Sequence, residues 1–369
     1  MNMECQSTRL PGLDGLRGVS ILLVLMLHSV WYQHLHLPDH AVKIINQATF
    51  PLGTFGVPIF FVISGFLITY LLLREEARNG KISLKGFWVR RFFRIVPPVA
   101  IYVSCVGVYA YYAGVGVTTK DFLAVLFFFR NLVGGVEITA HFWSLSLEEQ
   151  FYLFWPLALF FAPRPWRLKA AIFLLAAFPV MRIVSVVWLL PSQHVFVMNL
   201  VRFDFILMGC VLALLWKAHG YIALSRMTGD KLFISGSILI VAAWWLSFQS
   251  RLFPCFGNMT TLSDVLQQEL ITLQLGMGVC AIMIALATNS TQLLGGKLLN
   301  FPLLSGIGAI SYSLYLWQQF FFFAPNLPHF MMYLPVRMVC SLGVAAASYY
   351  FVERPFTRLR HKIGSTGGK

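Results

Sequence analysis

Apolar runs recur along the whole chain, and each is long enough to cross a lipid bilayer as a helix. A spanning helix needs about 20 predominantly apolar residues. Hydrophobic residues make up 58% of the 369 residues and charged residues only 11%, which is more apolar surface than a soluble domain of this size can bury. The sequence therefore predicts an all-α fold, a polytopic membrane helical bundle of about ten transmembrane helices. The predicted spans are residues 19–36, 55–73, 96–114, 144–162, 170–190, 196–216, 232–249, 266–288, 303–324 and 333–352.

The distribution of Lys and Arg predicts how these spans are oriented. Most of the 28 Lys and Arg residues fall in the two termini and in alternate loops between the spans. Because positively charged loops stay on the cytoplasmic side, we expect both termini to be cytoplasmic. The same rule accounts for the net charge of +14, so no nucleic-acid partner is expected. Residues 120–132 are too short an apolar run to span and are expected to be re-entrant or interfacial.

The domain organisation follows from the same pattern. No loop is long enough for a second folded domain, and the six Cys residues form no Cys-x-x-Cys pair or other metal-binding spacing. We predict no metal site. The first apolar run lacks a small-residue cleavage site after it, so it is expected to remain as a span. The predicted domain covers residues 1–356, and residues 357–369 are expected to form a basic cytoplasmic tail.

The first predicted span contains an ionisable pair, Arg17 and His28. These residues are eleven positions apart, so on a helix they share nearly one face at a separation of about 16 Å along the axis. Asp14 precedes Arg17 by three residues and can pair with it. Ionisable side chains inside a membrane span usually mark function. The alternative is that Arg17 is an anchor at the cytoplasmic surface and His28 a hydrogen-bonded residue of the bundle interior.

A basic run, WVRRFFRIVPP at residues 88–98, leads into the third predicted span. Arg91 and Arg94 are three positions apart, so their guanidinium groups lie on one helix face and can form a fork for a phosphate or pyrophosphate. The headgroups of anionic lipids would suit the same pattern. Both interpretations remain open at this stage.

Two adjacent carboxylates, Glu148 and Glu149, occur in the segment HFWSLSLEEQFYLFWP at residues 141–156. Neighbouring residues point about 100° apart around a helix, so one carboxylate is expected to face the bundle interior. A buried Glu can polarise an imidazole or relay a proton for it. Glutamate is also favoured near helix N-termini for electrostatic reasons alone. At the start of the segment, the rings of His141 and Trp143 can stack on a sugar.

Polar groups return near the end of the chain. The segment SYSLYLWQQ, residues 311–319, places hydroxyl, ring and amide groups in a late span, where Tyr315 and Gln318 are candidates for substrate contacts. The alternative is the ordinary polarity of helix packing in membranes. In the closing VERPF segment, Glu353 and Arg354 are expected to form an ion pair where a helix ends.

Six of these segments together resemble the acyltransferase 3 family, whose members are integral-membrane O-acyltransferases of bacterial glycans and some small molecules. In chain order they are LDGLRGVSILLVLMLHS, FGVPIFFVISGFLI, RRFFRIVPP, HFWSLSLEEQFYLFWP, SYSLYLWQ and VERP. The resemblance implies an acyl-CoA donor, essential Arg17 and His28, and an Arg-x-x-Arg pair at Arg91 and Arg94. Many members have His after the Leu-Trp of the late motif, whereas Gln318 stands there in this chain, so hydrogen bonding rather than proton transfer is expected at that position.

These interpretations combine into an expected function. The chain would be a multi-pass protein of the bacterial inner (cytoplasmic) membrane that moves an acyl group, acetyl in the first place, from acetyl-CoA or another acyl-CoA. The acceptor would be a hydroxyl of an extracytoplasmic glycan such as lipopolysaccharide O-antigen or exopolysaccharide, free or lipid-linked. Membrane lipid is the other expected partner, and the sequence predicts no oligomeric state. The alternative function is a polytopic transporter of a glycan or small anionic metabolite, because intramembrane charges suit that class equally.

Each candidate residue has an expected role in this reaction. His28 is expected to be the general base or to carry the acyl group, and Glu149 to orient it, with Glu148 or Asp14 as the other candidates for that role. The phosphates of the donor are expected to bind Arg17, Arg91 and Arg94. The residues expected to bind the acceptor are His141, Trp143, Glu148, Tyr315 and Gln318.

Overall fold

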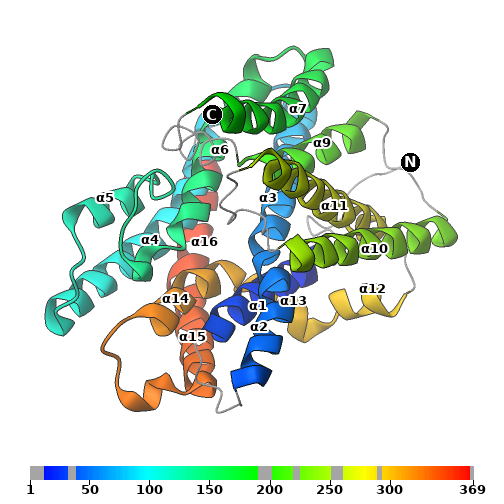
Figure 1. Cartoon of the computed structure of the whole chain (residues 1–369). Coiled ribbons are helices and arrows are strands. Elements are labelled where there is room, and N and C mark those ends of the chain that lie inside the picture. The colour runs from blue at the N-terminus through cyan, green and yellow to red at the C-terminus, as the bar shows by residue number, and fades with distance from the viewer. Residues whose placement is uncertain are drawn as a thin grey trace.

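The computed structural model describes residues 12–31, 39–189, 202–218, 225–250, 261–288 and 293–365 of the chain. Every regular element within these residues is a helix, as predicted (Figure 1). The first half contains α1 (Leu13–Trp31), α2 (Asp39–Thr54), α3 (Gly56–Asn79), α4 (Leu84–Ala113), α5 (Thr119–Leu126), η1 (Glu137–Thr139), α6 (Phe142–Phe161) and α7 (Arg164–Trp188). The second half contains α9 (Asp204–Ala218), α10 (Arg226–Ser250), α11 (Leu262–Ala287), α12 (Leu294–Leu299), α13 (Pro302–Ala309), α14 (Ser311–Phe323), η2 (His329–Met332), α15 (Leu334–Ser348), η3 (Tyr349–Glu353) and α16 (Arg354–Ser365).

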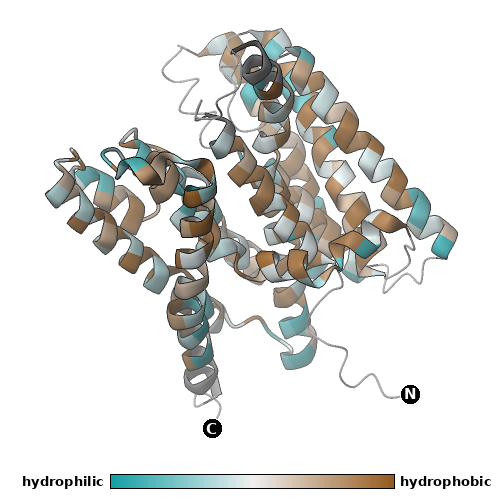
Figure 2. Ribbon diagram, turned by 90° about the horizontal axis from the view of Figure 1, so that it is seen from below, coloured by the Kyte–Doolittle hydropathy of each residue, from teal (hydrophilic) through white to brown (hydrophobic). Residues whose placement is uncertain are grey.

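Six predicted spans are confirmed as helices long and apolar enough to cross a membrane, counted over the described residues. They are Ala48–Asn79, Leu84–Ala113, Arg164–Trp188, Arg226–Ser250, Leu262–Ala287 and Leu334–Leu359. The other four predicted spans overlap α1, α6, α9 and the α13–α14 pair, which are helical but are not among the six. Residues 32–36 and 196–201 of these predictions lie outside the described residues. Apolar residues extend along the length of many helices (Figure 2). The total of ten spans and the cytoplasmic termini stay predictions.

The segment predicted not to span forms a short helix and a packed loop. α5 has only eight residues, and its first turn is closed by a capping box between Thr118 and Asp121. Burial raises the pKa of Asp121, but hydrogen bonds from Thr118 outweigh this effect and hold that pKa below its usual value. The buried Arg130 donates to the carbonyl oxygens of Val133, at 2.5 Å, and Val136, at 3.2 Å. The loop is therefore ordered by its own hydrogen bonds, while its re-entrant or interfacial location stays a prediction.

Glycines allow α3 and α9 to pack with their backbones almost in contact. A Cβ atom on Gly65 would lie 1.9 Å from the carbonyl oxygen of Ile206, and one on Gly209 would lie 2.0 Å from the carbonyl oxygen of Val62. Small residues permit this close approach between membrane helices, where dispersion rather than the hydrophobic effect holds helices together. The contact fixes one face of α3 against α9. α1 packs beside α3 and also contacts α2, α13 and α14 (Figure 1).

A buried ion cluster joins α7, α9 and α11. Arg182 of α7 is 4% exposed and makes bidentate hydrogen bonds to two carboxylates, those of Asp204 and Glu269. Its Nη1 and Nη2 atoms lie 2.7 and 2.8 Å from the Asp204 oxygens, and its Nε and Nη2 atoms lie 2.6 and 2.7 Å from the Glu269 oxygens. Such bidentate pairs are the strongest hydrogen bonds between side chains. The cluster therefore fixes three helices at one point.

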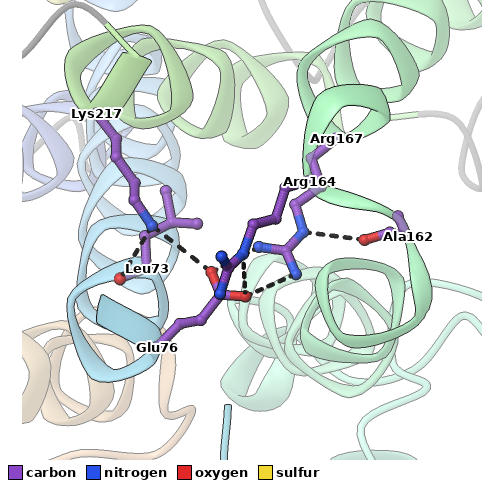
Figure 3. A network of polar contacts seen from close by, with 6 residues as sticks. All are labelled: Leu73, Glu76, Ala162, Arg164, Arg167 and Lys217. Carbon is purple, nitrogen blue, oxygen red and sulfur yellow. Dashed lines mark hydrogen bonds and ion pairs between the residues drawn. The ribbon is translucent and has the colours of Figure 1, made fainter. Parts of the chain in front are cut away.

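A second ion cluster joins α3, α7 and α9 at the carboxylate of Glu76 (Figure 3). The Glu76 oxygens lie 2.8 Å from Arg167 Nη1, 3.1 Å from Arg164 Nε and 3.5 Å from Lys217 Nζ. Arg167 also donates to the carbonyl oxygen of Ala162, at 3.1 Å. Three cations therefore share a single carboxylate, which is 6% exposed.

The end of the chain differs from its prediction. The helix expected to end at Glu353 and Arg354 instead continues through the π-helical turn η3 into α16. The Glu353 side chain accepts a hydrogen bond from Ser313, at 3.0 Å. The ion pairs between described residues do not include one between Glu353 and Arg354, so the predicted ion pair is wrong. Part of the predicted tail, up to residue 365, is helical, and residues 366–369 lie outside the described residues.

Candidate functional site

A cavity of about 120 Å³ lies between α1, α3, α4, α6 and α14. Most of its apolar wall comes from α3. Its polar lining is drawn from five separate segments of the sequence, which the fold brings to one place. The polar lining residues are Arg17, Ser64, Arg91, Arg94, Ser144, Glu148, Tyr152, Ser311, Tyr312 and Tyr315.

Positive charge dominates the cavity. Arg17, Arg91 and Arg94 face it together with one carboxylate, that of Glu148. Arg17 makes only a long ion pair with Asp14, at 3.9 Å, and neither Arg91 nor Arg94 forms an ion pair with a described residue. The three guanidinium groups therefore offer donors to an anion, and the predicted binding of a phosphate by Arg91 and Arg94 stays a prediction.

Arg91 is positioned by aromatic rings. Its guanidinium carbon lies 4.3 Å from the ring centroid of Tyr152 and 5.6 Å from that of Phe87. A guanidinium stacked in this way keeps its in-plane N–H donors available for a phosphate.

The imidazole of His28 is held by Gln318 of α14. The Nδ1 atom of His28 lies 2.5 Å from the Gln318 side-chain oxygen, while the Gln318 amide nitrogen donates to the carbonyl oxygen of Tyr315, at 3.3 Å. The second bond sets the orientation of the amide, so Nδ1 is the donor to Gln318 and Nε2 carries the lone pair. Phe323 packs edge-on against the ring, with centroids 5.0 Å apart. Gln318 thus hydrogen-bonds within the chain, and its predicted contact with a substrate stays a prediction.

His28 is not among the lining residues of the cavity. The cavity lining includes Ser144 and Tyr315, whose hydroxyls are hydrogen-bonded to each other. Tyr315 also donates to the carbonyl oxygen of His141, at 3.0 Å. Gln318 follows Tyr315 by one helical turn of α14, so the residue that holds His28 is one turn away from this hydroxyl pair.

The acidic residues predicted to orient His28 do not contact it. Asp14 is on α1, fourteen residues before His28, which is about 21 Å along the helix axis. Glu149 is outside the cavity lining, and one of its oxygens is buried without a hydrogen-bond partner among the described residues. Glu148 lines the cavity instead. The residue that orients the imidazole in the structure is Gln318, which we predicted only as a substrate contact.

The expected sugar-stacking surface is covered. His141 is 3% exposed, and its ring contacts the rings of Tyr102, Phe142 and Tyr315 at centroid distances of 5.4, 4.5 and 5.6 Å. These rings occupy the space a sugar would need, so the prediction that His141 stacks on an acceptor does not fit this structure. Trp143 is half-buried and packs against Phe61, 6.3 Å away.

Glu353 is a site residue that sequence reasoning missed. Its carboxylate is 5% exposed, accepts from Ser313 and acts electrostatically on both Arg17 and Arg94. Its position two residues before Pro355 suggested a helix end, so the buried counter-charge was not predicted. The rarity of an acidic residue at the end of an apolar run was the signal that could have identified it.

Comparison with known proteins identifies one family. The sequence profile described as an acyltransferase domain matches residues 10–351. This match confirms the resemblance to the acyltransferase 3 family. No solved structure matches the chain.

Curated relatives align with nearly the whole chain. The O-acetyltransferase OatA of Staphylococcus aureus is 27% identical over 377 residues, which cover 95% of this chain and 57% of the relative. The peptidoglycan O-acetyltransferase OatA of Listeria monocytogenes is 27% identical over 386 residues, covering 94% of this chain and 56% of the relative. The chain thus spans little more than half the length of these relatives.

Proposed function

The chain belongs to the acyltransferase family that matches residues 10–351, and we propose that it is a membrane O-acyltransferase. The proposed donor is cytoplasmic acetyl-CoA or another acyl-CoA, and the proposed acceptor is a hydroxyl of an extracytoplasmic glycan. Lipopolysaccharide O-antigen and exopolysaccharide are the candidate glycans, and the name of the Listeria relative adds peptidoglycan. The proposed location is the bacterial inner membrane.

One observation carries this proposal. A cavity lined by three guanidinium groups lies next to an imidazole whose tautomer is fixed by a buried amide. Guanidinium groups suit the phosphates of coenzyme A. An imidazole with a free Nε2 lone pair suits the removal of a proton from a hydroxyl group.

In the proposed reaction the arginines bind the donor, His28 transfers the proton and Gln318 orients His28. Arg91 and Arg94 bind the diphosphate of the donor, and Arg17 adds a third positive charge beside them. Nε2 of His28 takes the proton of the acceptor hydroxyl while its oxygen attacks the thioester carbonyl. A carbon–oxygen bond forms, the carbon–sulfur bond breaks, and the thiolate of coenzyme A leaves and recovers the proton from His28. Gln318 holds Nδ1–H throughout, so the neutral imidazole has its lone pair on Nε2.

Purified protein in liposomes tests the proposal. We expect acetyl-CoA to lose its thioester only when a glycan or small hydroxyl acceptor is present on the other side of the membrane, with one acetyl group added to the acceptor. Free thiol release and mass spectrometry of the acceptor measure the two products. Movement of an intact anion or glycan across the membrane, with the thioester preserved, would instead identify a transporter.

Gln318 should affect the rate more than donor affinity. We expect Gln318→Leu to lower kcat about 10- to 100-fold, by analogy with the loss seen when the hydrogen-bond partner of a metal-bound histidine is removed. The KM for acetyl-CoA should change little, because the guanidinium groups are untouched. Gln318→Glu should retain more activity than Leu, since a carboxylate also accepts from Nδ1–H. Steady-state kinetics in liposomes measures both parameters, and a change confined to KM would contradict the assignment.

A further inference from the structure

The cavity is too small for a whole coenzyme A donor. Sites for drug-sized ligands measure about 300–1,000 Å³, and this cavity measures about 120 Å³. If the proposed function is correct, a large part of the donor must therefore lie outside the cavity. The adenosine end, which carries the 3′-phosphate, is the part farthest from the thioester.

One face of α3 leads out of the cavity. Phe60, Ser64, Leu67 and Leu71 line it from successive turns of the helix, with the spacing of three and four residues that keeps side chains on one face. Leu71 is also 47% exposed. The cavity wall therefore reaches the surface at Leu71.

Two arginines continue this face beyond the cavity. Arg74 and Arg78 follow Leu71 at spacings of three and four residues, about 4.5 and 10 Å farther along the helix axis. Arg78 is exposed and Arg74 half-buried. Their guanidinium groups thus lie where a molecule leaving the cavity along α3 would pass.

The neighbouring carboxylates are already paired with other residues. Glu75 lies 2.8 Å from Arg90 of α4, which also places the start of α4 beside this end of α3. Glu76 points to the opposite side of α3, toward α7 and α9, and is bound by the cations shown in Figure 3. Arg74 and Arg78 form no ion pair with a described residue, so both charges are available to a ligand.

We propose that Arg74 and Arg78 bind the 3′-phosphate of the acyl-CoA donor, while Arg91 and Arg94 bind its diphosphate. This assignment rests on the proposed function. Two guanidinium groups one turn apart can hold a terminal phosphate through several charge-assisted hydrogen bonds. The enzyme would then distinguish acyl-CoA from donors that lack only this phosphate.

Kinetics with two donors tests the assignment. Acetyl-CoA and 3′-dephospho-acetyl-CoA are compared with the wild-type protein and with the double variant Arg74→Gln/Arg78→Gln in liposomes of phosphatidylcholine. We expect the wild-type protein to have a KM about 10- to 100-fold lower for acetyl-CoA, as charge-assisted hydrogen bonds allow. The double variant should lose this preference, with an unchanged KM for the dephosphorylated donor.

Two controls separate the site from general charge effects. The double variant Lys169→Gln/Arg226→Gln removes two exposed cations from other predicted cytoplasmic segments and should keep the wild-type preference. Arg91→Ala should raise KM for both donors by the same factor, because both carry the diphosphate. Retained activity with the dephosphorylated donor shows that the Arg74/Arg78 variant is folded.

The possible failures can be told apart. A wild-type preference that survives in the Arg74/Arg78 variant, or a wild-type protein that does not distinguish the donors, would overturn the 3′-phosphate site alone. An equal loss with both donors would show that these arginines serve lipid headgroups or topology instead. If the wild-type protein consumed neither thioester, the proposed function itself would fail.

Discussion

Replacing His28 with Ala is expected to reduce acyl transfer by about 10²- to 10⁴-fold, the contribution of a positioned general base. The reason is that no other imidazole or carboxylate among the described residues is hydrogen-bonded to Gln318. His28 is only half-buried, so truncating its side chain should leave little strain in the bundle. Initial rates in liposomes measure the loss, and the thermal midpoint in detergent shows that the fold is intact.

His329 provides the matched control for this prediction. It is an exposed histidine on the short helix η2, and His329→Ala should retain wild-type rates. A His28→Ala protein with near-normal acylation would remove the imidazole from the mechanism. An acyl group trapped on His28 by rapid quenching would show that it carries the group instead of acting as a base.

Removing Arg182 is expected to destabilise the protein more than any other single change considered. Arg182→Met leaves the buried carboxylate of Asp204 and the half-buried carboxylate of Glu269 without their shared cation. Breaking a buried ion pair from one side costs about 3–5 kcal/mol. Chemical or thermal unfolding in detergent should show the loss as a lower midpoint, with α7, α9 and α11 losing protection from hydrogen exchange first.

A compensating variant makes this prediction specific. Adding Asp204→Asn and Glu269→Gln to Arg182→Met removes the uncompensated charges and should recover much of the lost stability. The exposed Arg226→Met should change stability by only about 0.5 kcal/mol or less. If Arg182→Met were as stable as Arg226→Met, the cluster would contribute nothing to the fold.

The fold could be predicted where apolar runs were long and uninterrupted. The spans at α3, α4, α7, α10 and α11 followed from hydropathy alone, because each of these helices must present apolar side chains along its length. α6, by contrast, carries Glu148 and Glu149. α6 was predicted as a span, but it is not among the six described helices that are long and apolar enough to cross a membrane.

Only those features of the site that follow from the periodicity of a single helix could be predicted. The shared face of Arg91 and Arg94 follows from their spacing on one helix. Arg17 and Glu148 belong to α1 and α6, and only the packing of these helices brings both to the cavity. The contact between His28 and Gln318 joins residues 290 positions apart, and no local pattern encodes it. The burial of His141 and of Glu353 depends in the same way on the packing of other helices.

The hydrogen-bonded hydroxyls of Ser144 and Tyr315 bear on how long a bound donor would survive without an acceptor. If the proposed function is correct, a thioester bound in the cavity has this hydroxyl pair, and not His28, in its wall. Water in the cavity then has no direct contact with the imidazole. Loss of the donor by hydrolysis would therefore be slow while the pair stays in place and no acceptor is bound.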